Sequence, residues 1–123
     1  MHCGASRLTQ ALARMESPTL NELVADAERQ FHAALGSSFH VASRELLGES
    51  HYRGGFRLVF AAASSQVQVL YGDLELEVTT NGRELFGPAV HTGFAGNMFS
   101  REHLKEHLPG IAASSFAQLH VAG

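Results

Sequence analysis

Cysteine is almost absent from this chain of 123 residues, because Cys3 is the only one. A single thiol excludes an internal disulfide and is typical of proteins in a reducing compartment. The chain also lacks any apolar run near the roughly 18 residues that cross a bilayer. Residues 1–15 lack the apolar core of a secretory signal. We therefore expect a cytoplasmic protein with no membrane partner.

Charged residues are scarce as well, at 17% of the chain, and positive charge is the scarcer sign. Nine Lys and Arg against twelve Asp and Glu give a formal net charge of −3. Nucleic-acid binding needs a dense positive surface that displaces counterions, so the composition excludes that class of partner. Hydrophobic residues make up 45% of the chain and include eight Phe, which is enough for a core. The length fits one domain over residues 1–123.

Helical patterns dominate the N-terminal third. Ser17 is a suitable N-cap, Pro18 suits the first helical position, and Gly36 is a suitable stop. Between them the apolar residues recur at helical spacing: Leu20, Leu23, Val24, Ala27, Phe31, Ala34 and Leu35. An earlier amphipathic helix is expected from the spacing of Leu8, Leu12 and Met15. We predict a core-facing helix from residue 18 to residue 35.

The middle of the chain alternates between apolar and polar residues, as strands do. Residues 37–50 fit a helix or a strand, and we favour a short helix at 44–47. Gly54-Gly55 breaks the chain before the sheet, and Asn81-Gly82 is a hairpin signal because both residues tolerate a positive φ. The phase of alternation flips at Gly72-Asp73, which predicts a tight turn or a bulge. These patterns predict four strands: 56–61, 67–71, 74–78 and 83–86.

The last third of the sequence predicts helix again. Ser100 is a plausible cap for a helix over 101–108, and Pro109-Gly110 is expected to break or kink the chain after it. A weak amphipathic pattern resumes beyond that point at Ile111, Ser115, Phe116 and Leu119. The fold class is therefore α+β: N-terminal helices, a four-stranded antiparallel meander, and a C-terminal helix or helix pair packed on the sheet.

The part of the sequence that most resembles a metal or catalytic site is HTGFAGNMFSREHLKEHLPG, residues 91–110. His103 and His107 are four residues apart, so a helix places both on one face, where they can reach one zinc ion with His91 or Glu102 as a third ligand. The H-x-x-E-H string also matches inverted zinc proteases, but no acidic ligand comes after Glu106. The other interpretation is a solvated helix whose histidines favour the C-terminal dipole. We favour the helix.

Apolar residues also stand where a solvated sheet face should be polar: Val59, Ala61 and Leu70. Either helices cover this face or a second copy of the protein does, and we predict a homodimer through the sheet at these residues. On the next strand Asp73, Glu75 and Glu77 form a polar face, with Arg57 and Arg83 as expected cross-strand partners.

We interpret the chain as a non-enzymatic binding module that self-associates and binds an apolar small molecule or a protein partner. The sheet, or the loop around Phe94, would form the binding surface. Its candidate residues are Tyr71, Phe86, Phe94, Met98 and Phe99. The alternative is a small metal-binding protein or metal-dependent hydrolase that holds zinc through His91, His103 and His107, with Glu102 or Glu106 as the base. No other cofactor is expected.

Overall fold

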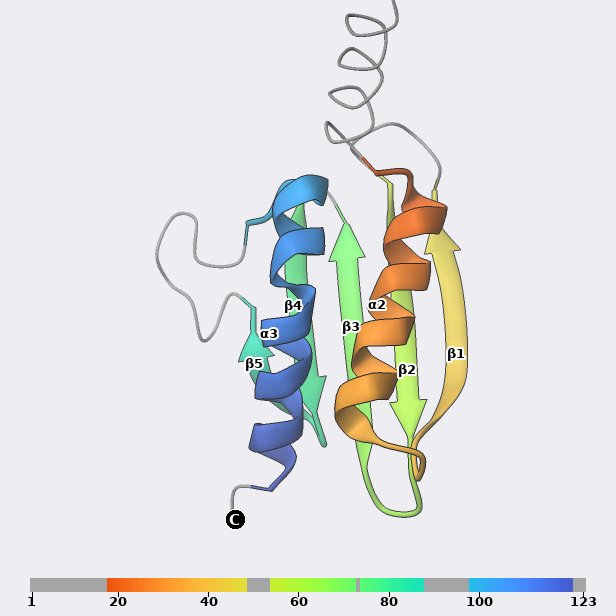
Figure 1. The fold of residues 1–123 in the computed structure, drawn as a ribbon, viewed down its shortest axis with the longest axis vertical. Helices are drawn as coiled ribbons and strands as arrows, with labels where there is room; N and C mark the ends of the chain where they lie inside the picture. Colours follow the sequence, from red (N-terminus) through yellow and green to blue (C-terminus); the bar gives the residue numbers. More distant parts are fainter. Residues whose placement is uncertain (1–17, 49–53, 73, 88–97, 121–123) are drawn as a thin grey trace, which may run out of the picture.

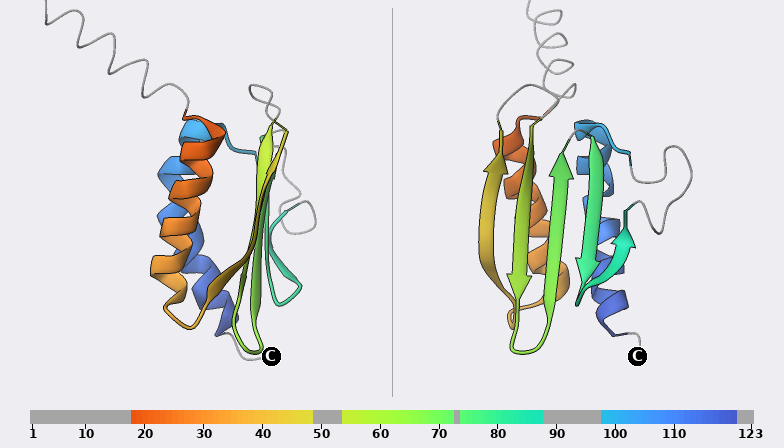
Figure 2. Two further views of the ribbon diagram at one scale, coloured as in Figure 1. Left: turned by 90° about the vertical axis from the view of Figure 1, so that its right-hand side faces the viewer. Right: turned by 180° about the vertical axis from the view of Figure 1, so that it is seen from behind.

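The computed structural model describes residues 18–48, 54–72, 74–87 and 98–120 of the chain. They form two layers, an antiparallel sheet and a pair of helices that both lie on one face of it (Figures 1 and 2). The predicted α+β class is confirmed, with five strands in place of four. The elements are α2 Leu20–Leu35, β1 His40–Leu47, β2 Gly55–Ala61, β3 Gln66–Gly72, β4 Glu75–Thr80, β5 Arg83–Phe86 and α3 Arg101–Leu119.

The additional strand is β1, and the helix predicted at residues 44–47 is wrong. β1 pairs antiparallel with β2, so that Arg44 lies opposite Leu58 and Leu46 opposite Phe56. A four-residue helix satisfies few of its own backbone groups, and it would leave one edge of β2 without partners. Pairing with β2 therefore outweighs the weak helical pattern of this segment.

The N-cap of α2 lies two residues later in the chain than predicted, at Thr19 rather than at Ser17. Thr19 is the N-cap: its Oγ1 accepts from the Glu22 N–H at 3.1 Å, and its own N–H donates to Glu22 Oε1 at 3.0 Å. This reciprocal pair satisfies two backbone donors, which Ser17 with no acid three residues later cannot do. The predicted stop is confirmed, because Gly36 ends the helix with φ of 95°. The helix expected around residues 8–15 lies outside the described residues.

The predicted turns between the strands are confirmed in most details. Asn81 and Gly82 have φ of 52° and 82°, the positive values that a type I′ hairpin requires. The phase flip after Gly72 coincides with a turn, as expected, and Leu74 has φ of 67° in it. Leu74 was predicted in the strand, but β4 begins at Glu75. Asp73 lies outside the described residues.

The C-terminal segment forms one helix, α3, rather than two. Ser100 caps it as predicted, with its Oγ accepting from the His103 N–H at 3.2 Å. Pro109 lies inside the helix without ending it. Its missing N–H would have bonded to the carbonyl of Lys105, and both residues are exposed, so water can take that role. The buried face of α3 extends on both sides of the proline. Leu104 and Leu108 come before it, and Ile111, Ala112 and Ser115 come after it.

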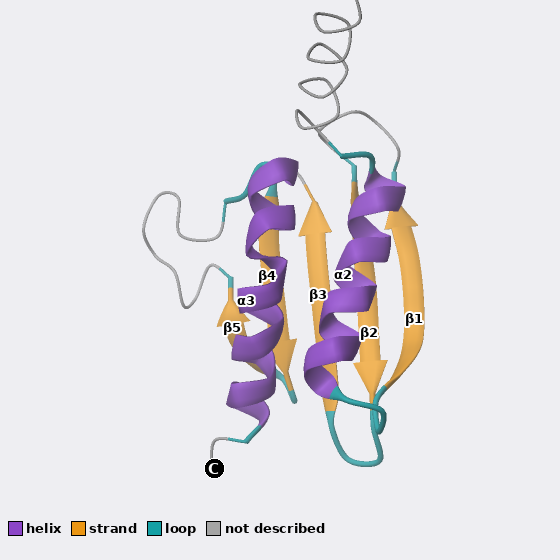
Figure 3. Ribbon diagram, viewed as in Figure 1, coloured by secondary structure: helices purple, strands orange, loops and turns teal. Residues whose placement is uncertain are grey.

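The core lies between the sheet and the two helices, which pack side by side (Figure 3). Phe31 of α2 stacks on Phe60 of β2 with ring centroids 5.6 Å apart. The inner face of the sheet is fully buried at Phe56, Leu58, Phe60, Val67, Val69, Tyr71, Leu76 and Val78. Within the described segments, no helix combines the length and the apolar character needed to span a membrane.

Candidate functional site

The surface of the sheet opposite the helices is covered by no described element (Figure 2). We call it the open face. Val59 and Ala61 of β2 and Leu70 of β3 lie on it and are partly exposed, because their strands alternate between buried and half-buried residues. The register of the strands adds Ser43, Glu45, Leu47, Arg57, Gln66, Gln68, Glu75, Glu77 and Thr79 to the same face. The three residues predicted for an interface therefore share one surface.

A row of charged and apolar side chains crosses the open face at right angles to the strands. Arg57 of β2 lies opposite Leu70 of β3, which lies opposite Glu77 of β4. On the other side of Arg57, Glu45 of β1 accepts a hydrogen bond from Arg57 Nη2 at 2.6 Å. The expected pairing of Arg57 with the β4 acids is wrong, because β3 separates β2 from β4. Arg83 lies opposite Thr80.

Tyr71, a predicted binding residue, lies in the core. Its side chain is fully buried, and its hydroxyl donates to the carbonyl of Phe99 at 2.7 Å. Burial raises the pKa of Tyr71 to about 12, while the nearby Arg101 guanidinium acts in the opposite direction. The Phe99 N–H also donates to the carbonyl of Leu74 at 2.8 Å. Tyr71 thus ties the segment before α3 to the sheet.

Two other predicted binding residues, Phe86 and Phe99, contact each other. Their rings meet edge to face with centroids 6.2 Å apart, and Phe99 meets His107 of α3 in the same way at 5.8 Å. Met98 is 40% exposed and forms an isolated bridge with Glu75 of β4. Phe94 lies outside the described residues. Phe99 therefore packs between β5 and α3, and Met98 is the more accessible side chain of the two.

The histidine pair of α3 lies on the exposed side of the helix. His103 and His107 have ring centroids 6.4 Å apart, as expected for residues four positions apart. His91, the proposed third ligand, lies outside the described residues. Among the residues that are described, no group of three or more His, Cys, Asp or Glu could hold a metal ion. The described part of the chain thus supplies two imidazoles toward the predicted zinc site.

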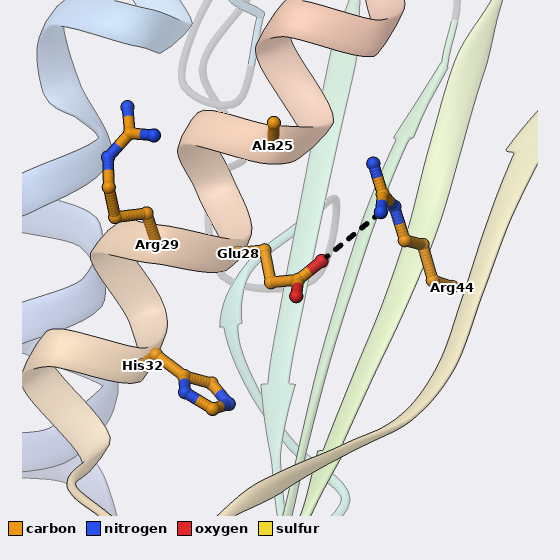
Figure 4. Close-up of a pocket in the computed structure, with 5 residues that line it drawn as sticks. All are labelled: Ala25, Glu28, Arg29, His32 and Arg44. Atoms are coloured by element: carbon orange, nitrogen blue, oxygen red, sulfur yellow. Dashed lines mark ion pairs between the residues drawn. The ribbon is translucent and has the colours of Figure 1, made fainter.

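An open pocket of about 350 Å³ lies between α2 and β1 (Figure 4). Its lining residues are Ala25, Glu28, Arg29, His32 and Arg44. Arg44 of β1 reaches toward Glu28 of α2, with Nη1 and Oε1 3.7 Å apart, whereas Arg29 points away from that pair. Ion pairs this exposed contribute at most about 1 kcal/mol to stability.

The sequence pattern does not predict this pocket, because the pocket depends on a β-bulge in β1. The register of β1 shifts between Val41 and Ser43, so Arg44 lies opposite Leu58 on the helix side of the sheet. Without the shift, strict alternation would place Arg44 on the other side. A bulge has no signal in this stretch that distinguishes it from ordinary alternation.

Comparisons of this chain with protein-family models, with curated proteins and with solved structures find no match. Geometry and chemistry therefore distinguish the candidate sites. The open face unites the three predicted interface residues, and the pocket beside β1 has a charged lining. The open face is the stronger candidate, because it carries apolar side chains that no element of the described part of the chain covers.

Proposed function

We propose that this protein is a non-enzymatic binding module that self-associates through the open face of its sheet. One observation carries the proposal. Both helices lie on the same side of the sheet, so Val59, Ala61 and Leu70 face away from the core. An antiparallel sheet with one solvated face normally carries polar residues at such positions. Contact with a second sheet would remove these apolar side chains from water.

The size of the open face suits a second copy of the protein. Strands lie about 4.8 Å apart and rise about 3.4 Å per residue, so five strands of up to eight residues cover roughly 500 Å² in projection. The solvent-accessible area of the face is larger than this projected area, because its side chains protrude. It approaches the roughly 800 Å² that each partner contributes to a standard interface. Two sheets in a sandwich pack about 10 Å apart with their strands nearly aligned, which is the arrangement proposed here.

A small apolar ligand fits the described structure less well than a protein partner does. The pocket between α2 and β1 is lined by Glu28, Arg29, His32 and Arg44 around the single apolar Ala25. Such a lining would leave charged groups without water or partners if an apolar molecule filled the space. The partner that the chemistry favours is therefore a protein surface, and the proposed partner is a second copy of this chain.

Replacing Leu70 with glutamate is expected to convert a dimeric protein into a folded monomer. The substitution places a carboxylate at the centre of the proposed interface, where it would lose its water, and the neighbouring Arg57 already pairs with Glu45. Sedimentation velocity over a range of concentrations measures the association, and circular dichroism checks the fold. A Leu70→Glu variant that stays dimeric would contradict the proposal, as would a wild-type protein that is monomeric throughout.

Leu46→Glu is the matched control for this experiment. Leu46 lies on β1 opposite Phe56, on the helix side of the sheet, and is 37% exposed. The chemical change is identical, but the side chain lies away from the open face. This variant is expected to remain dimeric, so any general effect of a Leu-to-Glu change in the sheet is separated from an effect on the interface.

A second candidate, a His-dependent metal-binding protein, is favoured by the exposed pair His103 and His107 on α3. Zinc titration by calorimetry of the wild type, His103→Ala and His107→Ala distinguishes the two candidates. The proposed binding module predicts no stoichiometric zinc binding that depends on these residues. Micromolar or tighter binding that both variants lose, and that weakens at low pH as imidazole protonates, would favour the metal candidate.

A further inference from the structure

The charge pattern across the open face constrains how two copies can meet. β3 is the central strand of the sheet (Figure 2). Its Leu70 lies opposite Arg57 of β2 on one side and Glu77 of β4 on the other, at the same level along the strands. Neighbouring strands are about 4.8 Å apart, so the positive and negative groups flank the leucine almost symmetrically. Among the described residues, Glu77 has no ion-pair partner, whereas Arg57 already binds Glu45 of its own chain.

Two face-to-face arrangements with a two-fold axis keep the strands aligned. An axis in the plane of the interface and perpendicular to the strands would place β2 over β2 of the partner and β4 over its β4. Centred on Leu70, it would oppose Arg57 to a second Arg57 and Glu77 to a second Glu77. Like charges in direct opposition oppose association. This arrangement is electrostatically unfavourable.

An axis parallel to the strands has the opposite effect. Rotation about this axis reverses the order of the strands in the partner but leaves each residue at the same position along the strand direction. As a result β2 lies over β4 of the partner subunit, and β3 lies over its β3. Leu70 then meets Leu70 of the partner subunit, and Arg57 meets Glu77 of the partner subunit on both sides of the axis. The contact is isologous, because the same patch of each copy supplies both halves of every pair.

The neighbouring row of the open face is compatible with the same axis. Val59, Gln68 and Thr79 lie opposite one another on β2, β3 and β4. Rotation about an axis parallel to the strands places Gln68 over Gln68 of the partner subunit, where two amides can exchange hydrogen bonds. It places Val59 over the partner's Thr79, which presents a methyl group. Neither contact buries a charge or opposes like charges.

We propose that two copies pack open face to open face about a two-fold axis that is parallel to the strands and passes beside Leu70. This inference rests on the self-association proposed above. Each interface then contains the Leu70 pair at its centre and two reciprocal Arg57–Glu77 ion pairs beside it. The strands of the two sheets cross at about 30°, the usual angle of an aligned sandwich, and the two long side chains bridge the gap of about 10 Å between the sheets. Arg57 has enough donors to hold Glu45 and the partner's Glu77 together.

Charge reversal tests this geometry. Arg57→Glu opposes acid to acid in its own homodimer, and Glu77→Arg opposes base to base, so each variant alone is expected to weaken dimerisation at least about tenfold. Mixed together, they form complementary pairs on both sides of the axis. Equimolar mixing is therefore expected to yield the heterodimer as the main dimeric species in native mass spectrometry. The double variant, Arg57→Glu with Glu77→Arg, is expected to dimerise as the wild type does.

The matched control is Glu45→Gln, which removes the negative charge beside Arg57 within the chain and leaves Arg57 and Glu77 in place. It is expected to keep the wild-type dimerisation. If the wild type is dimeric and Leu70→Glu is monomeric, but Arg57→Glu and Glu77→Arg each dimerise as tightly as the wild type, the axis is wrong while the proposed self-association stands. If the wild type is monomeric, both proposals fail together.

Discussion

Replacing Gly55 with alanine is expected to destabilise the protein by about 3 kcal/mol, because β2 and β3 leave no room for a side chain there. A Cβ at this position would lie 1.8 Å from the carbonyl oxygen of Tyr71 and 2.7 Å from the Cα of Gly72. Both are backbone atoms of the adjacent strand, so no rotamer change relieves the overlap. The strands would have to separate at the end of β2, and part of their pairing would be lost. Urea denaturation of the wild type and the variant measures this loss.

Gly72→Ala is the control for the Gly55 experiment. Gly72 ends β3 beside Gly55, yet a Cβ added to it meets nothing within 4 Å. Its φ lies outside the left-handed region, so alanine carries no backbone penalty there. The expected change in the free energy of unfolding is below about 1 kcal/mol. If both substitutions lower the free energy of unfolding equally, the short contacts around Gly55 are not the cause of the lost stability.

Tyr71 is expected to make the stability of the protein fall in strongly alkaline solution. Its pKa is raised by burial from 10.0 to about 12 in the folded protein, and it returns to the ordinary value when the chain unfolds. Its contribution to stability is therefore complete below pH 10 and is lost as the pH rises through the folded pKa of about 12. Over this interval the loss approaches roughly 2–3 kcal/mol, since one pKa unit corresponds to about 1.4 kcal/mol.

Tyr71→Phe isolates this effect from the other groups that titrate in the same range. At about pH 8 the variant is expected to be less stable than the wild type by about 1 kcal/mol, because the carbonyl of Phe99 loses its donor. At about pH 11.5 the order is expected to reverse, because only the wild type carries the buried phenol. Urea denaturation at both values provides the comparison. Parallel stability curves with no crossing would contradict a titrating, buried Tyr71.

The fold was predictable where several local signals agreed. In α2 the stripe of apolar residues and the final Gly36 specified the face and the end of the helix. At Asn81-Gly82 the need for positive φ specified a hairpin, whatever the rest of the chain did. At α3 the sequence left one helix or two open, because Pro109 usually interrupts a helix; packing of the buried face on α2 accompanies a single helix through the proline.

The candidate site was predictable only in part. The apolar residues Val59, Ala61 and Leu70 stood out from the alternation of their strands, so their shared surface could be anticipated. The pocket at Arg44 could not, because a bulge in β1 directs that side chain toward α2. The partner of Arg57 could not either, because β1 was not expected to be a strand at all.

The alternating and helical segments and the turns that need positive φ follow from the local sequence, since each depends on residues close together in the chain, and the scarcity of positive charge follows from the composition. The side of the sheet on which the helices pack depends on tertiary contacts. The sequence pattern leaves open whether a helix also covers the face that carries Val59, Ala61 and Leu70, whereas packing on Phe56, Leu58 and Phe60 holds both α2 and α3 on the opposite face. That selection places Arg57, Leu70 and Glu77 in one row on the surface that remains open, because strand register is set by pairing between distant segments.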